Sequence, residues 1–483
     1  MKRHFQYTIP FTTRWCWLLL LLAGTTTGCK KLVDVQVPIG SIAGSSVFQN
    51  DATSAAALNA VYASLYTQGN FDGNGGLGAV TGLYGDELKN QNGTPTYLAL
   101  YGDGVSTTLG GVTGYWTNFY SQLYSANLAI EGLKTPNGNL SYPNQWLGEA
   151  YFLRGLLYFY LTNCYGDVPL VLSSDYLYNN TLARSPQASV YKQIVADLKQ
   201  AQSLLDSKYH NAAGAVTTDR GRPNKAAATA LLARVYLYTQ DWANAEAQAG
   251  SLIADATDFQ LTALSKTFLL NSPEIIWGIE PYSAGLYPYQ VKDAKGFYMP
   301  AGKTPASIPV VATLSDSLMA AFEAGDARKA NWVGKDSVSP TAIYYYAYKY
   351  TAIGTYTAPQ EMIALFRLAE QYLIRAEARA QQNNLTGAAA DLNTVRTRAG
   401  LSATTAAIQS DLLAAILRER RVELFTESGH RFFDLRRTGK LDALMNVLAP
   451  LKGGTWASFK AWWPIPVGDI QNDTHLTQTP GFQ

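Results

Sequence analysis

The sequence predicts a mainly α-helical protein, with about four degenerate tetratricopeptide-like helical hairpins and an irregular, loop-rich half that contains short strands. Two observations lead to this fold class. Apolar and alanine residues recur at helical spacing in paired segments. Between the pairs lie long stretches rich in Gly, Pro and aromatic residues, which are typical of loops.

The helical pairs follow one another along the chain. The third and fourth resemble each other, because each has an Ala-rich first helix, a break near Asp241 or Asn384, and a second Ala-rich helix. A unit of about 34 residues is the tetratricopeptide period, and stacked hairpins bury one continuous core. The expected pairs are residues 51–66 with 115–133, 145–166 with 189–205, 224–240 with 241–255, and 361–382 with 385–400.

The remaining segments have a different composition and are the expected functional surface. Long insertions without regular structure are uncommon in compact domains unless they serve a function. In "AIYYYAYKYT" (342–351) the side chains alternate as in a strand. We assign residues 47–68, 115–257 and 359–400, with C-terminal helices in 410–448, to the helical half, and residues 69–114, 258–358 and 449–483 to the irregular half.

The N-terminus has the pattern of an exported lipoprotein. Basic residues precede a short apolar run from Trp15 to Gly24, which is typical of a signal peptide and too short to span a bilayer. Gly28 directly precedes Cys29, as in a bacterial lipobox. We predict a signal peptide over 1–28, lipidation of Cys29, a tether over 29–46 and one domain over 47–483. The alternative is an ordinary secreted protein in which Cys29 has no special role.

Charge and motif content exclude several functions. Of 38 Lys and Arg residues, three leave with the signal peptide, so 35 remain against 36 acids, and this net charge of −1 argues against nucleic acid as a partner. His210, His430 and His475 are far apart in sequence, and no HExxH or CxxC motif occurs. We predict no metal, no cofactor and no catalytic residues.

The most charged stretch is "RRVELFTESGHRFFDLRRTGKL" (420–441). His430 and Asp434 could form an orienting dyad, but a catalytic role would need a nucleophile that the sequence does not show. Arginine stems cover apolar surface while their heads pair with carboxylates. We therefore interpret the stretch as a structural clamp between helices, in which the arginines pair with Glu423, Glu427 and Asp434. Its predicted members are Arg420, Glu423, Arg431, Asp434 and Arg436.

This stretch also resembles the C-terminal signature of the SusD/RagB family of outer-membrane nutrient-binding lipoproteins of Bacteroidetes. Other segments resemble that family in the right order, among them "AYFLRGLLYFYLTNCYGDVPLV", "GRPNKAAATALLARVYLYTQDWANA", "LFRLAEQYLIRAEARA" and "WWPIPVGDIQNDTHLTQTPGFQ". The residue at the place of Thr26 is usually a branched apolar one in a lipobox, so there the chain departs from the pattern. The resemblance implies an anchor in the outer membrane facing the cell exterior, a glycan or other nutrient as ligand, and a SusC-like TonB-dependent barrel as partner.

Ligand residues do not carry over from the family, because they lie in variable loops. A sugar ring suits an aromatic platform edged by amides and carboxylates. From the irregular half we predict that Tyr84, Tyr97, Tyr101, Tyr287, Tyr289, Tyr298 and Trp332 bind the ligand. Two other functions are open on the sequence, a surface glycan-degrading enzyme and a tetratricopeptide scaffold for protein assembly.

Overall fold

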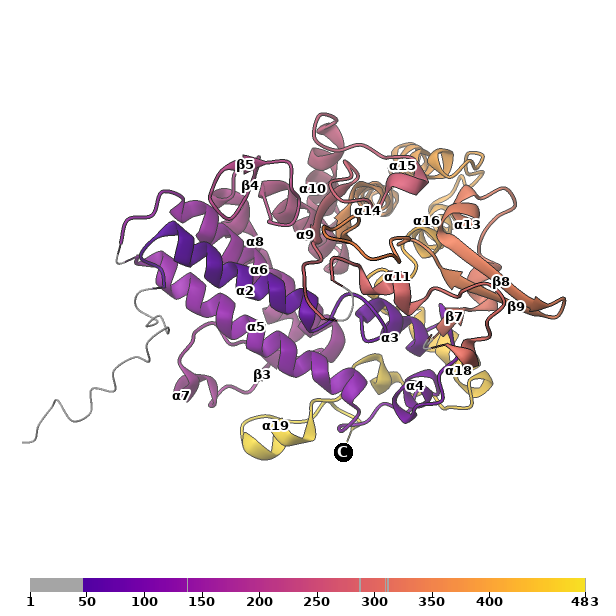
Figure 1. Cartoon of the computed structure of the whole chain (residues 1–483), viewed down its shortest axis with the longest axis horizontal. Coiled ribbons are helices and arrows are strands. Elements are labelled where there is room, and N and C mark those ends of the chain that lie inside the picture. The colour runs from indigo at the N-terminus through magenta and orange to yellow at the C-terminus, as the bar shows by residue number, and fades with distance from the viewer. Residues whose placement is uncertain (1–46, 137, 286–287, 309, 311, 483) are drawn as a thin grey trace, which may run out of the picture. The chain divides into compact units, whose positions relative to one another are not determined.

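The computed structural model describes residues 47–482, with gaps at 137, 286–287, 309 and 311 (Figure 1). The predicted signal peptide, Cys29 and the tether lie outside the described residues, as does Tyr287. In the part of the chain that is described, no helix is both long enough and apolar enough to cross a bilayer.

Four helical hairpins form the larger part of the structure, as the sequence predicts. Successive hairpins pack through α5 against α6, α8 against α9 and α10 against α14, so that they form one stack (Figure 1). The hairpins are α2 (Asp51–Thr67) with α5 (Gly110–Lys134), α6 (Pro143–Tyr165) with α8 (Gln187–Leu204), α9 (Lys225–Tyr238) with α10 (Trp242–Ala254), and α14 (Leu368–Gln381) with α15 (Leu385–Arg398).

Small side chains and polar caps account for the hairpin boundaries. Ala227, Ala230 and Ala233 of α9 are completely buried, and small residues at a helix contact allow neighbouring helices to approach closely. Asp241 accepts a hydrogen bond from Asn244 N at the start of α10, and Asn384 accepts one from Gly387 N at the start of α15. Both breaks predicted from the sequence are therefore helix N-caps.

One predicted helix begins later than expected. The first residues of the predicted helix 361–382 contain strand β10 (Ile363–Arg367), which pairs antiparallel with β6 (Ile275–Ile279) and places Phe366 opposite Trp277. Every residue of both strands is buried. A short, continuous apolar run does not distinguish a buried strand from a buried helix, which explains the error.

The segments expected to be irregular contain short elements. In residues 69–114 these are α3 (Leu77–Tyr84), β1 (Leu88–Asn90) and α4 (Pro95–Tyr101). In residues 258–358 they are η3 (Leu264–Lys266), β6, α11 (Lys292–Gly296), η4 (Pro305–Ser307), β7 (Ala312–Leu314), α12 (Asp316–Met319), α13 (Ala327–Trp332), β8 (Val333–Ser339) and β9 (Ala342–Ala347). The predicted strand is present, since β9 pairs with β8 in a hairpin that projects at the right of Figure 1.

Short elements also connect the helices of the stack. They are α7 (Tyr176–Asn179), strands β2 (Val168–Pro169) and β3 (Arg184–Ser185), which pair, and strands β4 (Tyr209–His210) and β5 (Val216–Thr217), which also pair. Each described sheet has two strands, so helices dominate the fold.

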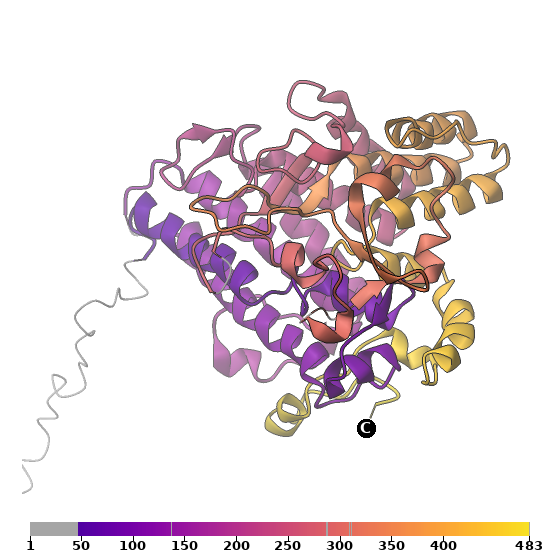
Figure 2. The same ribbon diagram turned by 45° about the vertical axis from the view of Figure 1, so that its right-hand side comes forward.

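The C-terminal helices cover the end of the stack. They are α16 (Gln409–Glu423), α17 (His430–Arg437), α18 (Leu441–Leu451), η5 (Ser458–Ala461) and α19 (Val467–Asn472). Helix α16 packs on α14 and α15, and the three form a layered group, orange to amber, in Figure 2. Gly429, with φ +81°, turns the chain between α16 and α17, a conformation that favours glycine.

The predicted clamp residues are buried or half-buried, but several partners differ from those expected. Arg420 Nε donates to Asp434 at 2.6 Å, as predicted. Arg431 instead binds both carboxylate oxygens of Asp86, at 2.9 and 2.8 Å. Arg436 donates to the backbone carbonyl of Asn163 at 2.6 Å, and its guanidinium lies 3.8 Å from the ring centroid of Trp462.

The expected pairing of Glu423 and Glu427 with arginines of their own stretch is wrong. Arg367 Nη1 binds Glu423 Oε1 at 2.5 Å, and Arg367 Nε binds Glu427 Oε2 at 2.8 Å. These cations come from distant parts of the chain, which the sequence could not indicate. We call this group the buried ion network, and its members are Glu274, Arg328, Lys349, Arg367, Arg398, Glu423 and Glu427.

Charge balance fixes the ionisation of this network. Burial alone would raise the pKa of Glu423, but Arg398, Arg367 and Arg328 outweigh burial and hold its pKa well below the ordinary value. A carboxylate whose pKa is depressed by folding stabilises the fold above its unfolded pKa, and that contribution disappears as the pH falls through the folded pKa.

We expect Glu423→Gln to lower the free energy of unfolding at pH 7 by about 3 kcal/mol, because it leaves three buried guanidinium groups without a shared countercharge. Denaturant titration measures the change. The destabilisation relative to the parent should begin to shrink below about pH 4, where Glu423 becomes protonated in the unfolded chain, and should disappear only when the pH falls through the depressed pKa of Glu423 in the folded protein.

The matched control is Glu246→Gln, which removes a half-exposed carboxylate that binds Arg379 at 2.8 Å. Such pairs contribute about 1 kcal/mol or less. Equal stability losses in the two variants would contradict a special role for the network.

Candidate functional site

Two of the predicted ligand residues are core residues, so their expected exposure is wrong. Tyr84 is completely buried in α3, and its hydroxyl donates to Lys460 O at 2.9 Å. Trp332 is 1% exposed and donates from Nε1 to Leu264 O at 2.9 Å. Lys349 Nζ lies 5.0 Å from the centroid of the Trp332 ring, so this ring covers the buried ion network.

The other predicted tyrosines that the structure describes are half-buried and lie on different elements. Tyr97 and Tyr101 are on α4, where Tyr97 Oη donates to Asn74 O at 3.4 Å and Lys452 Nζ lies 4.9 Å from the Tyr101 ring centroid. Tyr289, with φ +61°, donates from its backbone N to Tyr282 O at 3.1 Å and so closes a loop. Tyr298 packs with Tyr346 and Tyr348 beside the β8–β9 hairpin. These four tyrosines do not share one pocket among the described cavities.

A pocket beside α2 brings aromatic and polar side chains together. It has a volume of about 400 Å³ and is formed by α2, the loop after β5 and the end of β6. We call it the α2 pocket. Its lining residues are Asn59, Tyr62, Ala63, Asn211, Ala212, Asp219, Gly221, Arg222, Trp277, Ile279, Glu280 and Tyr282.

Three aromatic residues line the pocket. Trp277 is anchored by a hydrogen bond from Nε1 to Gly221 O at 3.1 Å and stacks on Phe366, with ring centroids 5.9 Å apart. Tyr62 donates from Oη to Glu149 Oε2 at 2.7 Å, which fixes its ring. Tyr282 is 36% exposed and packs against Tyr66 with centroids 5.2 Å apart. It is therefore the most exposed of the three rings.

The cation in the pocket is already paired. Arg222 Nη2 lies 2.7 Å from Glu149 Oε2, Arg222 also donates to Asn59 Oδ1, and its guanidinium lies 5.3 Å from the centroid of the Tyr62 ring. Burial raises the pKa of Glu149, although Arg222 acts in the opposite direction. These contacts fix Tyr62 and Asn59, the groups that α2 contributes.

Two carboxyl groups, those of Asp219 and Glu280, also line the pocket. Burial, and then the adjacent Asp219 carboxyl, raise the pKa of Glu280 to about 7. The pocket thus combines aromatic rings, an amide and carboxyl oxygens, which is the set of groups that binds the apolar face and the hydroxyl groups of a sugar.

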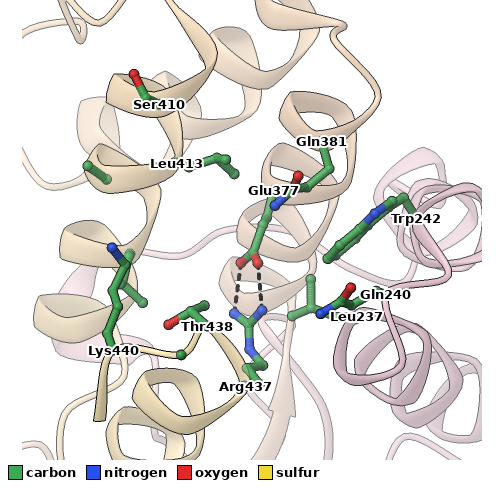
Figure 3. Close-up of a pocket in the computed structure, with 13 residues that line it drawn as sticks. Leu237, Gln240, Trp242, Glu377, Gln381, Ser410, Leu413, Arg437, Thr438 and Lys440 are labelled. Atoms are coloured by element: carbon green, nitrogen blue, oxygen red, sulfur yellow. Dashed lines mark hydrogen bonds and ion pairs between the residues drawn. The ribbon is translucent and has the colours of Figure 1, made fainter. Parts of the chain in front are cut away.

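A larger cavity than the α2 pocket has a different character. It measures about 660 Å³ and lies between α9, α10, α14, α16 and the end of α17. Figure 3 shows Glu377 and Arg437 joined in the middle of this cavity, with Trp242 on one side and Lys440 on the other. The ion pair is bidentate, at 2.5 and 2.7 Å, and Trp242 is the one aromatic residue among the lining residues. Size alone therefore does not make it the better sugar site.

None of the residues that line the α2 pocket was predicted from the sequence as a ligand residue. Tyr282 belongs to the run "EPYSAGLYPY", from which only the later tyrosines were chosen. Tyr62 lies on the predicted helix 51–66, which was not among the segments expected to bind the ligand. Trp277 sits in an apolar run that gave no sign of a pocket. The signal that could have found Tyr282 is the Pro- and Gly-rich context of the whole run.

Nothing in the described residues suggests a metal centre, since no three His, Cys, Asp or Glu side chains come together there in a metal-binding group. The proposed dyad is also replaced by other contacts. Asp434 accepts from Arg420 and Arg437, while His430 Nδ1 lies 4.0 Å from Glu370 Oε1. Burial, and then Arg234 and other cations, hold the pKa of His430 well below its ordinary value.

Comparison with known proteins identifies the family. A model described as the SusD family matches residues 333–482, and a second model, described as starch-binding and associating with the outer membrane, matches residues 46–237. The chain belongs to the SusD/RagB family. Members of this family are non-catalytic glycan-binding proteins, so the alternative of a degradative enzyme is set aside.

Two relatives come from Formosa agariphila. SusD-like protein P2 is 30% identical over 261 residues, which cover 53% of this chain and 48% of P2, so the match spans about half of that relative. SusD-like protein P38 is 25% identical and is matched over 99% of both chains.

Solved structures share the SusD-like fold. A SusD superfamily protein from Bacteroides vulgatus superposes with a TM-score of 0.77 at 22% identity, over 90% of this chain and 100% of the other. A laminarin-binding SusD-like protein gives a TM-score of 0.73 at 23% identity, also over 90% of this chain and 100% of the other.

The carboxyl pair should make stability depend on pH. A carboxyl group whose pKa is raised by folding opposes folding as the pH rises from its unfolded pKa to its folded pKa. We expect Glu280→Gln to raise the free energy of unfolding at pH 8 by about 1 kcal/mol, after a discount for solvent screening of this partly exposed group. The gain should shrink as the pH falls below 7 and be small at pH 5, because it is lost completely only below the pKa of Glu280 in the unfolded chain.

Denaturant titrations of parent and variant at both pH values measure this gain. A variant that is less stable than the parent at pH 8 would contradict the proximity of Glu280 to Asp219.

Proposed function

We propose that the protein binds a glycan in the α2 pocket at the surface of the outer membrane and delivers it to a SusC-like TonB-dependent barrel. The observation that carries the binding proposal is the pocket itself, in which the half-buried Tyr62 and the exposed Tyr282 are combined with Asn59 and two carboxyl groups above the completely buried Trp277. An aromatic wall contacts the C–H face of a pyranose ring, and polar groups at its edge bind the hydroxyls.

The relatives support this assignment. One solved structure of the same fold is a laminarin-binding SusD-like protein, and another is surface glycan-binding protein A from Bacteroides uniformis. A stretch of 132 residues is 36% identical to the starch-binding protein SusD of Bacteroides thetaiotaomicron. The names of these proteins point to carbohydrate as the ligand class, although they differ in the glycan that they name.

The membrane anchor and the barrel partner rest on the family and on the N-terminal sequence. Cys29 follows an apolar run and a Gly residue, and one matching family model is described as associating with the outer membrane. A lipidated cysteine holds the protein at the membrane surface, because each buried lipid methylene contributes about 0.8 kcal/mol. A barrel beside the anchored protein would receive the bound glycan.

A tetratricopeptide scaffold for protein assembly is the second candidate function. The four hairpins favour it, since such arrays present large surfaces to other proteins. It does not account for the aromatic α2 pocket, so glycan binding is the better-supported function.

We expect Tyr282→Ala to weaken glycan binding about thirtyfold, since truncation of a central aromatic contact costs about 2 kcal/mol. Calorimetric titration with laminari-, malto- and cello-oligosaccharides measures the loss. Tyr178→Ala is the matched control, because Tyr178 is 57% exposed on α7 and does not line the α2 pocket.

Both variants should keep the melting temperature of the parent. Unchanged affinity of Tyr282→Ala for a glycan that the parent binds would place the site elsewhere on the protein. A parent that binds no oligosaccharide would remove the glycan assignment.

We expect Cys29→Ser to leave the protein unprocessed or to release it from the membrane fraction, because serine cannot receive the thioether-linked lipid. Fractionation and mass spectrometry of the mature N-terminus measure this. Membrane retention and normal processing of the variant would contradict the prediction that Cys29 carries the lipid anchor.

A further inference from the structure

The carboxyl groups of the α2 pocket converge on one point. Glu280 directly follows strand β6, and Asp219 lies in the loop after β5. A Cβ atom placed on Gly221 would lie 3.3 Å from Asp219 Oδ1 and 3.3 Å from Glu280 Oε2. The backbone N of Gly221 donates to Asp219 Oδ1 at 2.9 Å, which fixes that carboxyl. The two acids therefore face the same small volume beside the pocket wall.

No cation of the described structure neutralises this pair. Neither Asp219 nor Glu280 forms an ion pair among the described residues. The cation that lines the pocket, Arg222, is committed to Glu149 at 2.7 Å and also donates to Asn59. Elsewhere in the protein, buried carboxylates such as Asp197 and Glu370 bind an arginine at 2.6 Å. The α2 pocket thus has an uncompensated negative charge.

An aromatic ring adds to the same preference. Tyr282 lines the pocket together with the two acids, and the face of an aromatic ring attracts a cation. The Tyr62 ring already has the Arg222 guanidinium 5.3 Å from its centroid. A full metal site is a poor match, because Ca²⁺ needs six to eight oxygen ligands and the pocket wall offers two carboxyl groups. An organic ammonium needs fewer ligands and fits between a ring and a carboxylate.

We propose that the α2 pocket selects glycans that carry an unacetylated amino sugar, whose ammonium group binds between Asp219, Glu280 and Tyr282. This inference rests on the proposed glycan-binding function and narrows its substrate class. The ammonium favours the ionised form of Glu280, so the proton that Glu280 carries below its pKa of about 7 passes to the solvent on binding. The sugar ring then lies against Tyr282 or Tyr62, and its hydroxyls meet Asn59 and Asn211 at the pocket edge.

The test compares tetrasaccharides that share one linkage and differ at a single substituent. Titration at pH 6, where an amine is protonated, uses β-1,4-linked tetramers of glucosamine, N-acetylglucosamine and glucose. We expect glucosamine tetramer to bind about tenfold more tightly than glucose tetramer, which is the usual size of one part-exposed charge or cation–π contact. N-acetylation should abolish this gain. Titration in buffers of different ionisation enthalpy should also show proton release with the glucosamine tetramer and none with the glucose tetramer.

The double variant Asp219→Asn with Glu280→Gln keeps the shape of both side chains and removes their charge. It should bind glucosamine and glucose tetramers equally, because the charge that distinguishes them is gone. Glu246→Gln, a carboxylate on α10 that does not line the pocket, should keep the tenfold preference. The single variant Glu280→Gln provides a second reading of the same effect if the double variant does not fold.

The possible results separate the inference from the function on which it rests. Equal binding of glucosamine and glucose tetramers by the parent overturns the amine preference and leaves glycan binding intact. No binding of any tetramer overturns both. A tetralysine peptide that binds as tightly as the glucosamine tetramer overturns the assignment to an amino sugar, because the pocket would then recognise a cation alone.

Discussion

The buried ion network around Glu423 is the interaction on which the rest of the structure depends. Glu423 is completely buried and binds arginines from α13, β10 and α15, which are separate in sequence. A buried carboxylate is stable only with such partners, because moving a charge from water into the interior costs several kcal/mol. Since each partner belongs to a different segment, the network forms only when the fourth hairpin, the C-terminal helices and the irregular segment are all in place.

The network also positions the candidate site. Arg367 is the last residue of β10, and β10 pairs with β6, which carries Trp277, Ile279 and then Glu280. The register places Ile363 opposite Ile279 and Phe366 opposite Trp277, so the buried strand pair sets the floor of the α2 pocket. The wall from α2 is fixed separately, through Tyr62, Glu149 and Arg222. A rigid floor and a fixed wall keep a binding site open without the entropy cost of ordering it when the ligand binds.

Local features of this chain could be predicted from its sequence, whereas ion pairs between residues far apart in the sequence could not. The helical hairpins follow from periodicity and from caps such as Asp241 and Asn384, which act within a few residues. The partners of Glu423 lie 25 to 95 residues away in the sequence, and the residues next to Glu423 give no indication of which arginines they are. Tyr84 and Trp332 were predicted to be exposed because loop composition does not reveal which rings are buried, and the Trp332 ring in fact lies 5.0 Å from the buried Lys349 Nζ. Tyr62 was overlooked for the opposite reason, since an aromatic residue on a helix is usually a core residue.

Hydrogen exchange with and without a bound oligosaccharide is the most direct test of the proposed binding site. It maps the surface that the ligand covers, and no residue has to be chosen for substitution in advance. We predict that a bound oligosaccharide slows exchange only in residues 59–67 of α2, the loop at 211–222 and residues 275–282. These residues line or adjoin the α2 pocket. Slowed exchange in α10, α16 and the end of α17, around the cavity of Trp242 and Arg437, would contradict this prediction.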